Sequence, residues 1–167
     1  MRALATGEER ALEELYRRYE RPLHQFLYRH TGGRDVEDLH QETWLRVVRS
    51  ARRFDPARRF STWLFQIAIN LCRDLHRRAP DEIEVHDPSA GSGTSSEPVD
   101  VRAELRIDAQ ALLRSLPEPQ REVVILRYYH DFSEEEAARI LGCPRGTVKS
   151  RLHHAIRRLI DLTGREP

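Results

Sequence analysis

Residues 144–152, with the sequence PRGTVKSRL, combine cationic and hydroxyl side chains of the kind that contact nucleic acids. Arginine can bridge the edge of a guanine, whereas lysine, threonine and serine can hold phosphates. Val148 and Leu152 are four positions apart and continue an apolar series to Leu159, which predicts an amphipathic helix with one buried side. The side chains that remain on its outer face are Arg145, Thr147, Lys149, Ser150, Arg151, His153 and His154.

A helix-turn-helix would position these side chains. Ser133 and Glu136 have the spacing of a capping box, which predicts a helix beginning directly after Ser133. Gly142 can end that helix because glycine adopts a positive φ, and Cys143 with Pro144 would form the turn. A short helix, a tight turn and a longer helix follow the plan of a motif whose second helix enters the DNA major groove. The alternative is a plain helical hairpin with a polar exterior.

A second basic stretch, residues 46–78, contains several aromatic rings. The rings are Phe54, Phe60, Trp63 and Phe65, and the neighbouring arginines are Arg52, Arg53, Arg58 and Arg59. Rings can stack on unpaired bases while guanidinium groups hold the backbone, although each ring could instead belong to the core. Phe54 is the preferred base contact because it adjoins a proline-containing turn. Asn70 could read a base edge or be a satisfied polar group of the core.

The net charge of +1 conceals a separation of charge along the 167 residues. Basic blocks at 46–78 and 139–158 flank a run of acidic residues between 81 and 100. Two basic blocks around an acidic spacer suggest two contacts with a polyanion, and the alternative is two solvated helix faces. A chain of this length forms one ordinary domain or two small ones.

Helical periodicity organises the N-terminal half. A first helix is expected after Thr6 as its N-cap, with Pro22 bending or splitting it and the glycines after Thr31 ending it. Asp35 is expected to begin a second helix, because acidic residues in the first turn suit the helix dipole. A third helix is expected over 61–77, with Trp63, Leu64, Ile67, Ala68 and Leu71 facing inward.

The periodicity stops from 79 to about 101, where Pro, Gly, Ser and acidic residues predominate, as in flexible linkers. It resumes near Leu105, and a further helix is expected over 120–130. The predicted fold is all-α: two small helical domains joined by a flexible acidic linker, the C-terminal one containing the helix-turn-helix. The expected boundaries are 1–78, 79–103 and 104–167.

Several kinds of site and location are not expected. No apolar run approaches the roughly 20 residues of a membrane span, so a soluble cytoplasmic protein without membrane insertion is predicted. Cys72 and His76 could share a helix face, but two ligands do not make a zinc site, and no metal or cofactor is expected. No paired carboxylates, activated nucleophile or phosphate loop suggests an enzyme.

Three stretches resemble the bacterial ECF-type (extracytoplasmic function) sigma factors, small members of the sigma-70 family that direct RNA polymerase to promoters. DVEDLHQETWLRVV at 35–48 is similar to region 2.2, and residues 54–78, FDPARRF to LHRR, are similar to regions 2.3 and 2.4. Residues 116–159, LPEPQREVV to AIRRL, resemble region 4. Two independent motifs in the same order make the resemblance specific, and it covers nearly the whole chain outside the linker.

The resemblance implies roles in protein binding for both halves of the chain. The residues expected to bind the clamp helices of the polymerase largest subunit are Asp35, Asp38, Gln41 and Glu42. Region 4 is expected to contact the flap of the second-largest subunit. An anti-sigma factor is a further partner that the resemblance suggests.

The resemblance also implies two contacts with promoter DNA. The residues expected to capture a flipped base of the minus-ten element are Phe54, Asp55, Arg58, Arg59 and Asn70. Flipping a base costs a few kcal/mol of lost stacking, which its binding pocket must return. The second helix of the helix-turn-helix, residues 145–154, is expected to read the minus-35 element.

Two other functions are compatible with part of the sequence. A helix-turn-helix regulator that acts without polymerase would explain residues 133–159 and leave DVEDLHQETW unexplained. A helical adaptor that binds only protein would leave the cations of residues 145–151 without a role.

Overall fold

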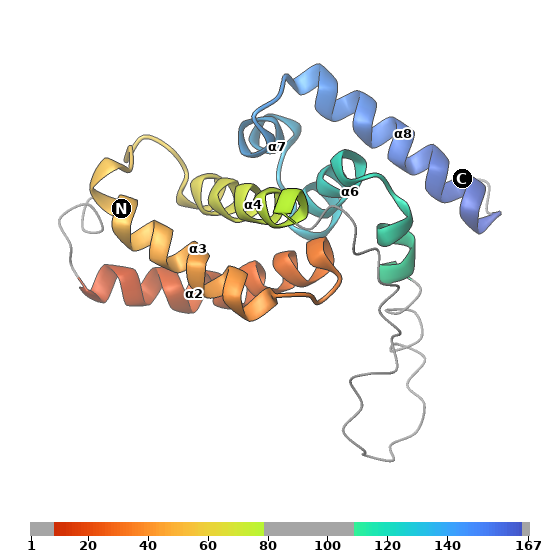
Figure 1. The fold of residues 1–167 in the computed structure, drawn as a ribbon. Coiled ribbons are helices and arrows are strands. Elements are labelled where there is room, and N and C mark those ends of the chain that lie inside the picture. The colour runs from red at the N-terminus through yellow and green to blue at the C-terminus, as the bar shows by residue number, and fades with distance from the viewer. Residues whose placement is uncertain (1–8, 79–108, 165–167) are drawn as a thin grey trace, which may run out of the picture.

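The computed structural model describes residues 9–78 and 109–164, and every regular element within these two ranges is a helix (Figure 1). The N-terminal half, residues 9–78, contains α2 (Glu9–Thr31), α3 (Val36–Ser50), the short 3-10 turn η1 (Ala51–Arg53) and α4 (Phe60–Arg78). The C-terminal half, residues 109–164, has a helix over 109–115 and then α6 (Glu118–Val124), the π-helical η2 (Ile125–Tyr129), α7 (Glu134–Leu141) and α8 (Arg145–Thr163). The all-α prediction is confirmed.

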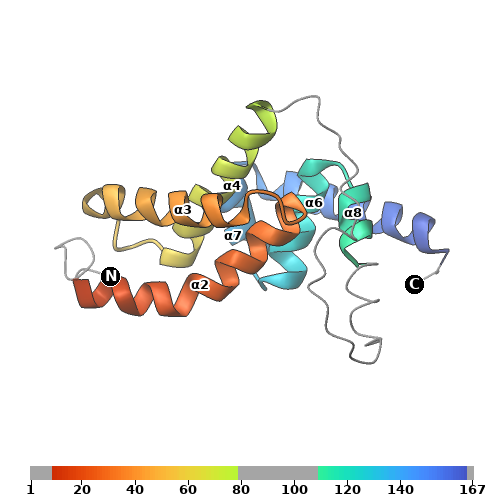
Figure 2. The ribbon, with the colours of Figure 1, turned by 60° about the horizontal axis from the view of Figure 1, so that its bottom comes forward.

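Pro22 lies inside α2 and does not split it. Figure 2 shows the axis of this helix changing direction part of the way along, as an internal proline causes by removing one backbone hydrogen bond. The helix ends as predicted, because Gly32 and Gly33 adopt φ of 72° and 94° and both donate to the Tyr28 carbonyl. The predicted N-cap, Thr6, lies outside the described residues.

The following helices differ from their predictions in detail. Asp35 precedes α3 with a left-handed φ of 52°, and its side chain makes no capping hydrogen bond. The α4 helix begins one residue before the predicted range, and its buried side includes Phe65 and Ile69. Two of the side chains predicted to face inward, Trp63 and Ile67, are only partly buried.

The helix-turn-helix forms as predicted. The Ser133 hydroxyl accepts a hydrogen bond from the Glu136 amide at 3.2 Å, and the Glu136 carboxylate accepts one from the Ser133 amide at 2.9 Å. Gly142 ends α7 with φ 66°. The helix expected over 120–130 is instead interrupted, because its α-helical hydrogen bonding gives way to the π-helical η2 segment.

The two halves pack against each other, and this packing is named the closed arrangement here. α4 lies against α7 (Figure 1), and Phe65 contacts Phe132 with 5.1 Å between ring centroids. The C-terminal end of α2 receives donors from the other half: Arg121 donates to the His30 carbonyl at 3.2 Å, and Arg114 to the Gly32 carbonyl at 2.7 Å. These bonds satisfy carbonyls that a helix end leaves without partners. The predicted linker and the periodicity near Leu105 lie outside the described residues.

Candidate nucleic-acid interface

The exposed face of α8 carries the side chains that the sequence predicted for it. Val148 and Ala155 are fully buried against the rest of the C-terminal half. The opposite face carries the exposed side chains Arg145, Lys149, Ser150, His153 and His154, with Thr147 and Arg151 half-buried. The N-terminal end of α8 therefore presents hydrogen-bonding and cationic groups to solvent, as a recognition helix does.

Two of these cations already have an anionic partner. Arg145 Nε donates to Glu134 Oε2 at 2.8 Å, and Lys149 Nζ lies 3.9 Å from the same oxygen. The hydrogen bond from Arg145 lowers the pKa of the Glu134 carboxyl, with the Lys149 charge assisting. A carboxylate in the first turn of α7 thus lies beside the cationic side of α8.

The aromatic rings in and near the loop between α3 and α4 do not lie as the sequence predicted. Phe54, the preferred stacking ring, is only 5% exposed and packs on Trp63 with 4.7 Å between ring centroids. Phe60 and Phe65 are also buried, so three of the four rings belong to the core and do not form a stacking platform. These rings are buried because each lies on the side of η1, of α4 or of the connecting turn that faces the core.

The polar residues of this loop are exposed. Asp55 organises the turn, because its carboxylate accepts a hydrogen bond from the Ala57 amide at 2.9 Å. Arg58 and Arg59 extend from the loop, and Arg59 forms an ion pair with Glu136 of the C-terminal half. Asn70 is exposed on α4, so its amide is not a satisfied group of the core.

The closed arrangement brings the two predicted DNA contacts together. Asn70 of α4 and Arg151 of α8 line the same cleft, which has a volume of about 710 Å³. Arg73, Arg77, Glu118 and Glu122 also line it. Cations and carboxylates from both halves therefore face one another across this cleft.

The predicted polymerase-binding residues lie on the outer side of α3. Asp35, Asp38 and Gln41 are exposed, while Glu42 is half-buried and accepts a hydrogen bond from Arg46 at 2.9 Å. Sequence reasoning missed the apolar part of this surface, Leu45 and Val48, which are 48% and 51% exposed. The sequence feature that could have indicated this apolar surface is Leu45, because it is an apolar residue on the polar side of the helix.

A buried polar group between the halves also went unpredicted. Arg73 of α4 donates to Glu122 of α6, which is 1% exposed, and His30 of α2 lies beside them with Nε2 at 3.7 Å from Glu122 Oε1. Burial alone would raise the pKa of Glu122, but His30 and Arg73 outweigh it and hold that pKa below its ordinary value. Cys72 nearby is a buried thiol, and burial raises its pKa to about 12.

Comparisons with known proteins agree with both halves of the chain. The sigma-70 region 2 family matches residues 15–80, and the sigma-70 region 4 family matches residues 106–159. The ECF RNA polymerase sigma factor SigW of Bacillus subtilis is 31% identical over 160 residues, which cover 88% of this chain and 86% of that protein. The region 2 match accounts for the residues that a polymerase-independent regulator would leave unexplained.

Two solved structures share the fold. One is CnrH in complex with the cytosolic domain of CnrY, with a TM-score of 0.74, 29% identity and coverage of 96% of this chain and 92% of that one. The other is the sigma factor RpoE in complex with the anti-sigma factor NepR from Bartonella quintana, with a TM-score of 0.72, 28% identity and coverage of 93% and 98%. Among the described residues, no helix is long and apolar enough to cross a membrane. The chain therefore belongs to the ECF sigma factors of the sigma-70 family, which direct the initiation of transcription by RNA polymerase.

Proposed function

We propose that the two halves of this sigma factor contact different promoter elements. The outer face of α8 reads the minus-35 element in the major groove, with Arg145, Lys149 and Arg151 supplying the cationic contacts. The observation that carries the proposal is the division of α8 into a buried side, with Val148 and Ala155, and a cationic side at its N-terminal end. The side chains of that face can bind both base edges and phosphates.

The N-terminal half contacts the minus-ten element. Arg58, Arg59 and Asn70 are its exposed polar groups, and Asp55 holds the loop that carries the two arginines. Phe54 is buried beside this loop, so it can contact a base only if the loop opens. Guanidinium groups hold the backbone of the separated strand, while the amide contacts a base.

The exposed face of α3 binds core polymerase. Asp35, Asp38 and Gln41, with Glu42 beside them, suit a basic helical partner such as the clamp helices, and Leu45 and Val48 add apolar area. The C-terminal half contacts the flap of the second-largest subunit. None of these roles requires catalysis by the chain itself. They require a cytoplasmic location, where polymerase acts.

An anti-sigma factor is the expected regulator. Both solved relatives were captured with a partner protein, CnrY in one and the anti-sigma factor NepR in the other. An anti-sigma factor that covers either half would prevent its contact with polymerase or DNA.

Promoter binding requires the closed arrangement to open. Asn70 and Arg151 line one cleft, whereas the two promoter elements lie about 25 base pairs apart, roughly 85 Å along B-form DNA. Residues 79–108 span at most about 100 Å when fully extended, which is sufficient for this separation.

Reconstituted transcription tests the function. Purified protein added to core polymerase should produce transcripts with defined start sites on promoter fragments from the host genome. Arg151→Ala should reduce the yield, whereas the same substitution at Arg158, near the other end of α8, should not. The proposal is wrong if core polymerase that responds to another sigma factor gives no transcript with this chain.

A further inference from the structure

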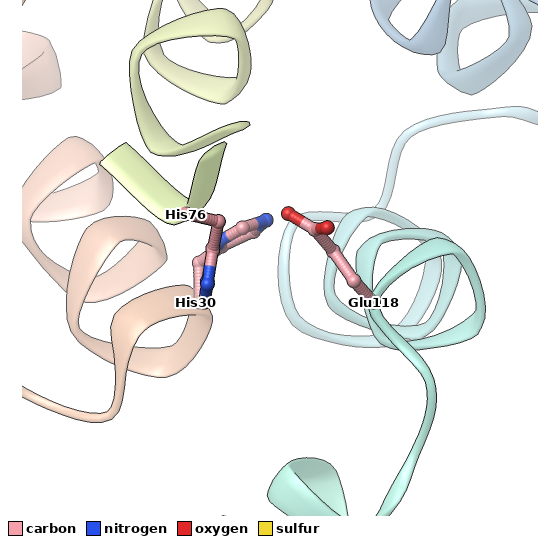
Figure 3. Close-up of side chains that lie close together, drawn as sticks. All are labelled: His30, His76 and Glu118. Carbon is pink, nitrogen blue, oxygen red and sulfur yellow. The ribbon is translucent and has the colours of Figure 1, made fainter. Parts of the chain in front are cut away.

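Three side chains from different helices converge between the two halves. They are His30 of α2, His76 of α4 and Glu118 of α6. One ligand atom from each residue lies within 4.8 Å of the others, and Figure 3 shows the carboxylate of Glu118 directed toward the two imidazoles. The first two residues belong to the N-terminal half and the third to the C-terminal half.

The polar atoms of this cluster lack hydrogen-bond partners within the described part of the chain. His30 is fully buried, and neither of its ring nitrogens is hydrogen-bonded. His76 Nε2 and Glu118 Oε1 are also buried without a partner. Such groups are unfavourable unless something binds them, because each has lost its contacts with water.

The nearest acidic neighbour does not satisfy His30. Glu122 Oε1 is 3.7 Å from His30 Nε2, beyond hydrogen-bond distance, and both Glu122 oxygens accept hydrogen bonds from Arg73, at 2.7 and 2.8 Å. A fully buried imidazole therefore faces a second imidazole and a carboxylate, each with an atom available for another bond.

We propose that His30, His76 and Glu118 form a binding site for a divalent transition-metal ion of the zinc class. Two imidazoles and a carboxylate are ligands that zinc uses, whereas Mg²⁺ and Ca²⁺ select oxygen ligands. Ligand atoms of a tetrahedral zinc site are about 3.4 Å apart, given bond lengths of about 2.0–2.1 Å. The candidate ligand atoms lie within 4.8 Å of one another, so the side chains must move closer together when the ion binds.

The surroundings of the cluster provide access and a fourth ligand position. His76 and Glu118 line the cleft of about 710 Å³ between the halves, so an ion and a water ligand can enter from solvent. The sequence suggested only Cys72 and His76 as ligands, but Cys72 is fully buried in the core. The third ligand comes from the other half of the chain, and spacing could not reveal it.

A metal ion in this site would link the two halves. Its ligands stay together only in the closed arrangement, so binding the ion favours closure, and promoter binding favours release of the ion. This coupling rests on the proposed function, because it assumes that promoter binding separates the halves. The existence of the site does not depend on that assumption.

Metal binding is tested on the full-length chain after treatment with a chelator and its removal. Zinc titration followed by calorimetry should give one site, and zinc should raise the thermal unfolding temperature. Glu118→Gln and His76→Gln should each lower the affinity at least about 100-fold, since each removes a ligand. The matched controls Glu135→Gln and His24→Gln alter an exposed and a half-buried residue outside the cluster and should bind zinc as the wild type does.

His30 is left unchanged because its full burial makes any substitution a risk to folding. The site is refuted if the folded wild type binds no zinc, or if the Glu118 and His76 variants bind it as tightly as their controls. In either case the cluster is a polar contact between the helices and not a metal site. Magnesium chloride at the same concentrations should have no effect.

The coupling has its own measurement. Small-angle X-ray scattering should show a smaller radius of gyration with zinc than without it for the wild type, and no change for Glu118→Gln. Zinc should also weaken binding to a two-element promoter fragment in the presence of core polymerase. Zinc that binds through Glu118 without either effect would overturn the coupling, whereas failure of the proposed function would appear as absent transcription under all metal conditions.

Discussion

Arg73 donates two hydrogen bonds to Glu122 across the boundary between the halves, from Nε to Oε1 at 2.7 Å and from a terminal nitrogen to Oε2 at 2.8 Å. Glu122 is 1% exposed, and Arg73 also donates to the Leu141 carbonyl at 3.4 Å. A planar guanidinium and a carboxylate that pair in this way fix both distance and orientation. The pair is therefore a specific contact of the closed arrangement.

Replacing Arg73 with methionine should shift the protein toward an open form. The change leaves Glu122 buried without its cation, and breaking a buried pair in this way costs about 3–5 kcal/mol. Separation of the halves exposes Glu122 to water and removes most of that cost. The radius of gyration in small-angle scattering should rise, whereas Arg77→Met, which affects a pair within α4, should leave it unchanged.

His130 should make stability depend on pH. Its ring packs on Phe26 and Phe65, and burial lowers its pKa from 6.5 to about 4, with Arg29 lowering it further and Asp131 opposing. As the pH falls, His130 takes up a proton near pH 6.5 in the unfolded chain but only near pH 4 in the folded chain. The resulting stability is complete above pH 6.5 and falls by on the order of 3 kcal/mol as the pH drops to about 4.

The contribution of His130 is measured by urea unfolding between pH 7.5 and pH 4. The variant His130→Leu should lose less stability than the wild type over this interval, and the difference between the two should be constant above pH 7. Parallel curves of stability against pH down to pH 4 would show that His130 does not control the pH dependence.

Ser133→Ala should destabilise the helix-turn-helix by about 1 kcal/mol, because the first turn of α7 loses a side-chain acceptor. A loss of this size lowers the melting temperature by about 2–4 °C in a chain of this length. Ser150→Ala, in the second turn of α8, removes an exposed hydroxyl that is not a cap and should cause no such loss. Calorimetric melting of both variants distinguishes the cap from a general effect of removing serine.

Asp38→Ala combined with Gln41→Ala should weaken binding to core polymerase and leave the helical circular-dichroism spectrum intact. Both residues are exposed on α3, so their removal leaves the core unchanged. Glu13→Ala, an exposed carboxylate on α2, is the control for a general change of charge. Equal polymerase affinity of the double variant and the control would remove the docking surface from the proposal.

Arg151→Ala should lower the affinity for duplex DNA of any sequence and reduce the slope of log affinity against log salt by about one unit. No ion pair engages Arg151 within the part of the chain that the structure describes. A lost phosphate contact affects all sequences alike, whereas a lost base contact would affect one position of the site. Fluorescence anisotropy at several salt concentrations separates the two, and an unchanged slope would exclude a phosphate contact.

The elements with local signals could be predicted from the sequence. The capping box of Ser133 and Glu136, the glycine at 142 and the apolar series of α8 all act within a few residues, so their pattern determines the local structure. The η2 segment could not be predicted, because no local sequence pattern distinguishes a π-helical turn from a continuation of the α-helix.

The contacts between the halves were beyond sequence reasoning for a different reason. Arg73 and Glu122 are separated by 49 positions, and no periodicity connects them. The same limit applies to His30, His76 and Glu118, which meet only through the packing of three helices. The burial of Phe54 was missed because aromatic residues beside arginines suit a core and a stacking surface equally well.

Glu134 has a further consequence for the energetics of DNA binding. It acts as a built-in counterion for Arg145 and Lys149, which lie 2.8 and 3.9 Å from one of its oxygens. A cation that a carboxylate already neutralises adds less ion release when it meets a phosphate. For the promoter binding that we propose for α8, we therefore expect weaker sequence-independent binding and a larger share of the affinity from base contacts.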